Sequence, residues 1–207
     1  MSDAPVPTDP TGRRYAATAI VLHWAIAGLI VANIVLAWQF DDLKGMAQFR
    51  LIQWHKSLGV TVLLLTLLRF AWRLFNRPPP FPPEMPRWER IAAAATHWGF
   101  YAFMVLMPVT GWLMVSASPT NIPTLLYRTV PWPHLGFIHH LPMIERKPLE
   151  HQFKAWHETI ADIGYVLIVL HVAAALRHQL FKRDLVLWRM APLPLLKPRP
   201  ARTEETR

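Results

Sequence analysis

The most constraining feature of the sequence is an apolar stretch, 153–176, that carries a histidine near each end, His157 and His171. In a helix, residues fourteen apart point within roughly 40° of each other and lie about 21 Å apart along the axis. Polar rings in an apolar span are costly to bury without partners. The small residues Ala161 and Gly164 lie between them on the same stripe and would let a bulky planar group approach. The stretch therefore predicts a transmembrane helix with one binding histidine near each membrane face.

Three further stretches, at about 15–40, 51–75 and 91–115, are apolar and long enough to span a membrane. The chain has 207 residues, of which 53% are hydrophobic and 17% charged. Because only helices and closed barrels satisfy the backbone inside lipid, these lengths favour helices. We therefore expect an all-α integral membrane protein, a bundle of four transmembrane helices within one domain at 15–190.

The remaining segments are expected to lie outside the bilayer. Residues 1–14 have the polar composition of a disordered tail, and 191–207 form a basic, proline-rich tail. The outer link, 116–152, is rich in Pro and His and too long for a simple turn, so we expect it to cap the membrane surface. Its histidines, His134, His139 and His140 with His151, are interpreted as surface residues with at most weak metal binding.

Lysine and arginine give the orientation of the helices. They concentrate in the N-terminal tail, in the link between the second and third spans, and after the fourth span. The positive-inside rule then predicts that both termini are cytoplasmic. The net charge of +9 is interpreted as anchoring to the lipid bilayer, and no nucleic-acid partner is expected. The absence of cysteine excludes disulfides, thiolate iron–sulfur ligation and c-type haem attachment.

The membrane histidines fall at two depths. His23 and His171 lie toward the inner side, whereas His55 and His157 lie toward the outer side. Pairs from different helices at two depths would clamp two planar macrocycles inside a bundle. His97 also lies at inner depth and competes with His23 for the partnership. Zinc fits less well, because a zinc site gathers three or four ligands at one depth.

A haem with two axial imidazoles has no open coordination position, which favours electron transfer. Arg69 follows His55 by fourteen residues and shares its face at inner depth, where it could neutralise haem propionates. Lys56 and Lys154 could do the same on the outer side. Ordinary snorkelling of long basic side chains at an interface explains these three residues equally well.

Several motifs carry a family resemblance, and they run from about residue 13 to 190. They are Leu22-His23-Trp24, Trp54-His55-Lys56-Ser57-Leu58-Gly59, Met107-Pro108-Val109-Thr110-Gly111, Trp156-His157-Glu158-Thr159, Gly164-Tyr165 and Leu170-His171. The sequence resembles the bacterial cytochrome b561 family, which shares its four-helix di-haem design with the cytochrome b subunits of nickel hydrogenases and formate dehydrogenase. The resemblance implies two haems b, one held by the residues matching His23 and His171 and one by those matching His55 and His157. It favours His23 over His97 as a ligand.

Within that family, the sequence is most similar to the superoxide oxidase type, a match that extends to His178. The resemblance implies an oxidoreductase that passes electrons from periplasmic superoxide to ubiquinone. Lys56 and Lys154 would then attract the superoxide anion. We expect the quinone near the inner edge, where His97, Arg69 and His178 could bond its carbonyls and supply protons. The longer, His- and Pro-richer outer link departs from the family pattern.

Two other functions fit the same residues. The chain could be a haem-bearing membrane anchor that relays electrons for a separate dehydrogenase or a periplasmic redox partner, with 116–152 as the docking surface. It could also be a haem-free transporter that uses its membrane histidines as proton relays. A colourless purified protein would indicate the transporter, and a stoichiometric soluble partner would indicate the anchor.

Overall fold

The structure is a computed structural model that describes residues 14–81, 85–182 and 186–192. Residues 1–13 and 193–207, which make up most of the two predicted tails, lie outside the described residues.

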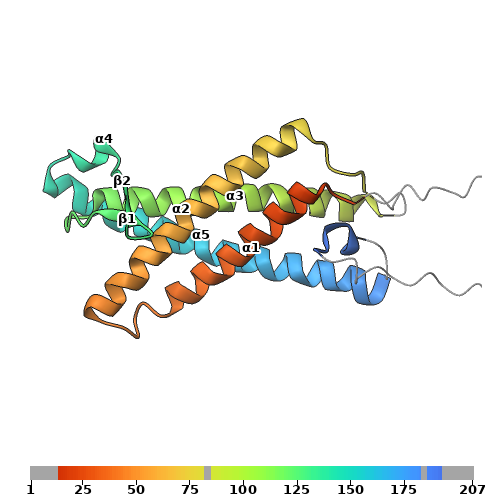
Figure 1. Ribbon diagram of the computed structural model, residues 1–207, viewed down its shortest axis with the longest axis horizontal. Coiled ribbons are helices and arrows are strands. Elements are labelled where there is room, and N and C mark those ends of the chain that lie inside the picture. The colour runs from red at the N-terminus through yellow and green to blue at the C-terminus, as the bar shows by residue number, and fades with distance from the viewer. Residues whose placement is uncertain (1–13, 82–84, 183–185, 193–207) are drawn as a thin grey trace, which may run out of the picture.

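Four long helices form the molecule: α1 (Ala17–Trp38), α2 (Gly45–Phe75), α3 (Arg87–Ala117) and α5 (Met143–Arg177). Each is long and apolar enough to cross a membrane. In Figure 1, α3 and α5 run side by side along the length of the molecule, and α1 and α2 cross them obliquely. The prediction of a four-helix membrane bundle is confirmed.

Two helices begin earlier than their apolar stretches. Helix α2 begins at Gly45 rather than near 51, and α5 begins at Met143 rather than near 153, inside the predicted outer link. Hydropathy marks only the part of a helix that meets lipid, whereas the helix itself continues wherever polar helix formers allow. Helix α5 has 35 residues, and its length of about 52 Å exceeds a hydrocarbon core of about 30 Å. The end of the bundle that carries the 116–152 link, which we call the outer end after the predicted orientation, therefore extends beyond the apolar spans.

The rest of the outer link contains a hairpin and one short helix. Strands β1 (Thr124–Leu126) and β2 (Val130–Trp132) pair antiparallel, with Leu125 opposite Pro131. Helix α4 (Gly136–His139) follows them and leads to α5. The link is a folded structure at the outer end of the bundle (Figure 1).

Polar side chains of α2 fix the hairpin in place. The backbone N–H of Tyr127 donates to Ser57 Oγ at 2.9 Å, and Gln53 Nε2 donates to the carbonyl of Pro123 at 3.0 Å. Gln53 and Ser57 are almost fully buried, with 5% and 1% of their surface exposed. Because these residues flank Trp54 and His55 along α2, the hairpin lies over the part of α2 that carries His55.

Close packing of α3 on α5 depends on a glycine. A Cβ atom at Gly164 would lie 2.2 Å from Phe103 Cε2. The phenyl ring of Phe103 therefore occupies the space beside Gly164 that we expected a planar ligand to use. Phe103 belongs to a buried cluster with Ile26, Val62 and Met104, which joins α1, α2 and α3.

The start of α1 meets the segment that follows α5. The N–H of Tyr15 donates to the carbonyl of Arg189, and Trp24 Nε1 donates to the carbonyl of Met190 at 2.8 Å. Arg189 Nη2 donates in turn to the carbonyl of Pro80, which follows α2. Three segments predicted on the cytoplasmic side thus lie at the same end of the bundle.

Candidate functional site

Four histidines form two pairs that lie on different helices. The ring centroids of His23 on α1 and His171 on α5 are 6.1 Å apart, and those of His55 on α2 and His157 on α5 are 6.2 Å apart. Two imidazoles that share one metal ion have centroids about 6 Å apart, because each metal–nitrogen bond is about 2 Å long. Both pairs therefore fit an iron held between two axial imidazoles.

In the outer pair, both imidazole rings have a hydrogen-bond partner at Nδ1, which leaves Nε2 for a metal. His157 Nδ1 lies 3.1 Å from Thr110 Oγ1, and His55 Nδ1 lies 3.3 Å from the carbonyl oxygen of Asn33. The Thr110 hydroxyl donates to the carbonyl of Leu106, so it accepts from His157. With Nδ1 carrying the proton in both rings, each Nε2 is free to bind iron, as in most metal-ligating histidines.

Gly111 makes room for the His157 ring. A Cβ atom at this position would lie 3.2 Å from His157 Cε1, which is closer than ordinary van der Waals contact. The motif around Thr110 therefore contributes both the bond and the space that orient the outer histidine. The sequence marked this motif as typical of the family but gave Thr110 no role.

At the inner end, two histidines compete for His171. The His97 and His171 ring centroids are 6.1 Å apart, the same separation as between His23 and His171. Phe100 also packs against His171, with centroids 5.2 Å apart. The separation alone does not distinguish His23 from His97 as the ligand, so the assignment of His23 rests on the family motif.

Arg69 lies with the inner histidines, as its spacing along α2 predicts. Its Nη1 donates to the carbonyl of Ala19 on α1 at 3.1 Å. Its charge is close enough to interact electrostatically with His23, His97 and His171. A haem propionate at this depth would lie near the Arg69 guanidinium, of which one N–H group already donates to Ala19. The propionate role stays a prediction.

The two lysines predicted to attract superoxide differ in their surroundings. Lys56 follows His55 and is partly buried, and its charge interacts with the rings of His55 and His134. Lys154 is 61% exposed and lies 3.7 Å from a carboxylate oxygen of Glu158, which partly offsets its charge. Lys56 is therefore the stronger candidate for attracting an anion toward the outer pair.

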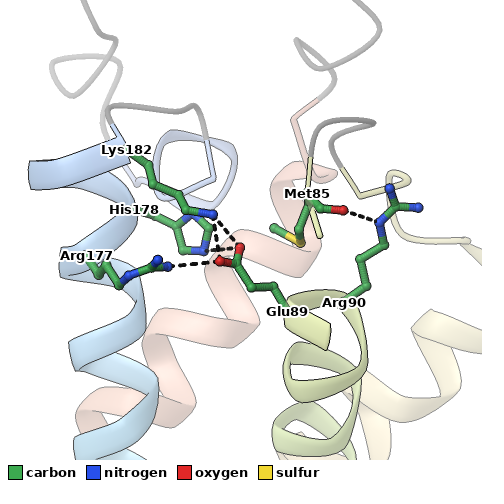
Figure 2. A network of polar contacts seen from close by, with 6 residues as sticks. All are labelled: Met85, Glu89, Arg90, Arg177, His178 and Lys182. Atoms are coloured by element: carbon green, nitrogen blue, oxygen red, sulfur yellow. Dashed lines mark hydrogen bonds and ion pairs between the residues drawn. The ribbon is translucent and has the colours of Figure 1, made fainter. Parts of the chain in front are cut away.

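His178 lies in a buried ionic network at the inner end, where α3 begins and α5 ends (Figure 2). Glu89 is 7% exposed and accepts hydrogen bonds from Arg177 at 3.1 Å and from Lys182 at 2.7 Å. His178 Nε2 lies 3.9 Å from the second oxygen of Glu89. The segment from His178 to Lys182 is a π-helical turn, η1, a feature that often occurs at functional sites.

The predicted quinone residues are thus divided between two environments. His97 and Arg69 lie beside His171, whereas His178 faces Glu89. Sequence reasoning missed Glu89. The signal was available, since this acidic residue stands between Arg87 and Arg90 in an otherwise basic segment.

The chain is similar to known proteins over most of its length. A family model described as prokaryotic cytochrome b561 matches residues 14–192. A Yersinia pestis protein named probable superoxide oxidase CybB is 28% identical over 186 residues, which cover 87% of this chain and 97% of that protein. An Escherichia coli K12 protein named cytochrome b561 homolog 1 is 30% identical over 182 residues, covering 86% of this chain and 97% of its own length.

Proposed function

Because the chain belongs to the prokaryotic cytochrome b561 family of membrane electron-transfer proteins, whose members bind haem b, we propose that it passes electrons from superoxide on the outer side to ubiquinone at the inner side. Two superoxide anions give up two electrons and leave as dioxygen. Ubiquinone takes the two electrons and two protons and leaves as ubiquinol. One protein then removes an oxidant and feeds a quinone pool.

The proposal rests on two pairs of histidines whose members on α5, His157 and His171, lie fourteen residues apart along that helix. Haem b held at each pair supplies one-electron redox chemistry. His55 and His157 would hold the outer group, with Thr110 and the Asn33 carbonyl fixing their rings. His23 and His171 would hold the inner group. With two histidines holding each group, the site would favour electron transfer over oxygen binding.

Basic residues and histidines of the chain would also attract superoxide and supply protons to the quinone. Lys56 would raise the local concentration of the superoxide anion beside the outer pair. At the inner end, His97 and His178 would bond the quinone carbonyls and deliver protons from the cytoplasmic side. Arg69 would balance the negative charge of the propionates of the inner haem.

The test is ubiquinone reduction by the purified, haem-loaded chain in detergent, with superoxide generated enzymatically. We expect ubiquinol formation without any other protein, at a rate that falls as ionic strength rises because surface attraction is screened. Lys56→Gln should lower the rate several-fold at low salt, and Lys44→Gln, another outer lysine near the start of α2, should leave it unchanged.

Two results would overturn the proposal. A haem-loaded chain that does not reduce ubiquinone with superoxide has a different donor or acceptor. Electron transfer that appears only when a stoichiometric soluble protein copurifies would favour the anchor for a separate dehydrogenase or periplasmic carrier.

A further inference from the structure

The outer link forms an open pocket of about 580 Å³ between the hairpin and α4. Its walls are partly apolar, from Pro131, Trp132 and Pro133, and partly imidazole, from His134, His139 and His140. No aspartate or glutamate lines it. The pocket is far larger than a diatomic molecule needs and falls within the range of about 300–1,000 Å³ that is typical of sites for small organic ligands.

A buried arginine lies behind the imidazole wall. Arg146 on α5 is 5% exposed, and its Nη2 donates to Asn121 Oδ1 at 2.8 Å and to the carbonyl of Ser118. Its Nε has no hydrogen-bond partner among the described residues. Both Asn121 and His139, which lies 3.5 Å from Arg146 Nη2, line the pocket.

The charge of Arg146 has no counter-ion in the part of the chain that the structure describes. The ion pairs found there involve Glu89 and Glu158, and Glu150, one turn further along α5, does not pair with Arg146. A buried charge without a partner is costly. A negatively charged ligand in the adjacent pocket would reduce that cost.

Other groups add to the positive potential. Lys56 on α2 and Arg146 on α5 both interact electrostatically with His134, and His134 Nδ1 lies 3.2 Å from His139 Nδ1. Two facing imidazole nitrogens could in principle share a metal ion. The guanidinium beside His139 makes a cation unfavourable, and no three His, Asp or Glu of the described residues form a metal cluster. The surroundings favour an anion.

We propose that this pocket binds a small planar organic anion, of the carboxylate or enolate class, with its charged group toward His134 and His139 and its body against Trp132 and the flanking prolines. Such a ligand matches the volume, the apolar walls and the uncompensated charge together. The pocket lies in the link 116–152 and shares the charge of Lys56 with the outer pair, but its lining contains neither His55 nor His157.

Proton uptake should accompany binding. Burial lowers the pKa of His134 below its ordinary value, and the charges of His139, Lys56 and Arg146 lower it further, against a small opposing effect of the Ile122 carbonyl. The free imidazole is therefore neutral near pH 7, and an anion beside it favours the protonated form. Affinity should increase as the pH falls from about 7.5 to about 5.5.

Benzoate and benzamide form a matched pair of probes, because they share one planar body and differ in charge. Titration of the haem-loaded protein, followed by calorimetry and by tryptophan fluorescence, should give benzoate at least about tenfold tighter binding than benzamide. His134→Gln should weaken benzoate binding about tenfold, whereas His151→Gln, an exposed histidine of α5 outside the pocket, should not change it. The haem spectrum of each variant checks that it is folded.

Equal affinity for benzoate and benzamide would overturn the proposal, as would an equal loss in the two histidine variants or an affinity that does not change with pH. The readout is binding, so these outcomes are independent of whether the protein transfers electrons from superoxide to ubiquinone.

Discussion

At the scale of single residues, the outer histidines owe their orientation to neighbours that do not touch the metal. Thr110 accepts a hydrogen bond from His157 while donating one to its own helix. A hydroxyl in this position selects the tautomer whose Nε2 can bind iron. Removing it should leave the helix intact and disturb only the ligand.

Thr110→Val should therefore weaken haem binding at the outer pair by about tenfold or more, as loss of such supporting bonds does in other metal sites. The rate of haem transfer to an apo-globin acceptor measures it. Thr66→Val is the matched control, since Thr66 is buried on α2 but its hydroxyl has no hydrogen-bond partner among the residues that the structure describes. Equal haem loss from both variants would contradict the role given to Thr110.

The inner pair offers a comparison of two histidines at the same distance from His171. His23→Ala should remove one haem per chain, and His97→Ala should retain both, because the family motif assigns the ligand role to His23. Haem content per chain after purification measures both. If His97→Ala loses the haem and His23→Ala keeps it, the pairing is wrong.

At this scale the sequence predicted a good deal. Helical spacing placed His55 and His157 at one depth and His23, His97, His171 and Arg69 at the other, because depth depends only on helix geometry. The choice of His23 over His97 as the partner of His171 came from the family resemblance. The sequence did not predict Thr110 as a partner of His157, nor Glu89 beside His178. Such contacts depend on the rotation of one helix against another, which a single sequence does not specify.

At the scale of helices and strands, close contact between α3 and α5 depends on Gly164, because glycine has no side chain to collide with Phe103. The Phe103 ring lies where the Cβ of any other residue at position 164 would be. Gly164→Ala should therefore separate the helices or displace the ring, at a cost of about 1–3 kcal/mol. Thermal unfolding in detergent, followed by the haem absorption band, measures the loss.

Gly28→Ala is the control for this substitution. Gly28 lies within α1, and a Cβ atom there would have nothing within 4 Å. Alanine should be neutral or slightly stabilising because it favours the helix more than glycine does. If Gly28→Ala destabilises the protein as much as Gly164→Ala, close packing at Gly164 is not the cause.

The apolar stretches predicted the four helices but not their true ends or the hairpin. The first ten residues of α5 contain six polar or charged residues and form no apolar run, although they are helical. The hairpin has only three residues per strand and depends on bonds to Gln53 and Ser57 of α2. An element this short has little preference of its own, so its position is decided by contacts distant in sequence.

At the scale of the whole molecule, ionic contacts between α3 and the C-terminal end of α5 hold the inner end together. Glu89 at the start of α3 binds Arg177 at the end of α5 and Lys182 of η1, the turn that follows α5 (Figure 2). Two cations share one buried carboxylate, so removing its charge leaves both without compensation. The helix ends should then separate more easily.

Glu89→Gln should lower the thermal unfolding temperature of the haem-loaded protein. Glu158→Gln is the comparison, because its pair with Lys154 is exposed on both sides, and exposed pairs contribute little to stability. Differential scanning fluorimetry measures both variants. A Glu89→Gln protein as stable as the parent would mean that the network does not hold the inner end.

The central claim is that α5 carries one ligand for each of two haems, one toward either end. The most direct test is the reduced-minus-oxidised visible spectrum of the purified protein together with a pyridine assay of haem per chain. We expect two haems b per chain with low-spin bands, as two axial imidazoles on each iron require. One haem per chain would contradict one of the pairs, and a colourless protein after haem-supplemented expression would contradict the electron-transfer function itself.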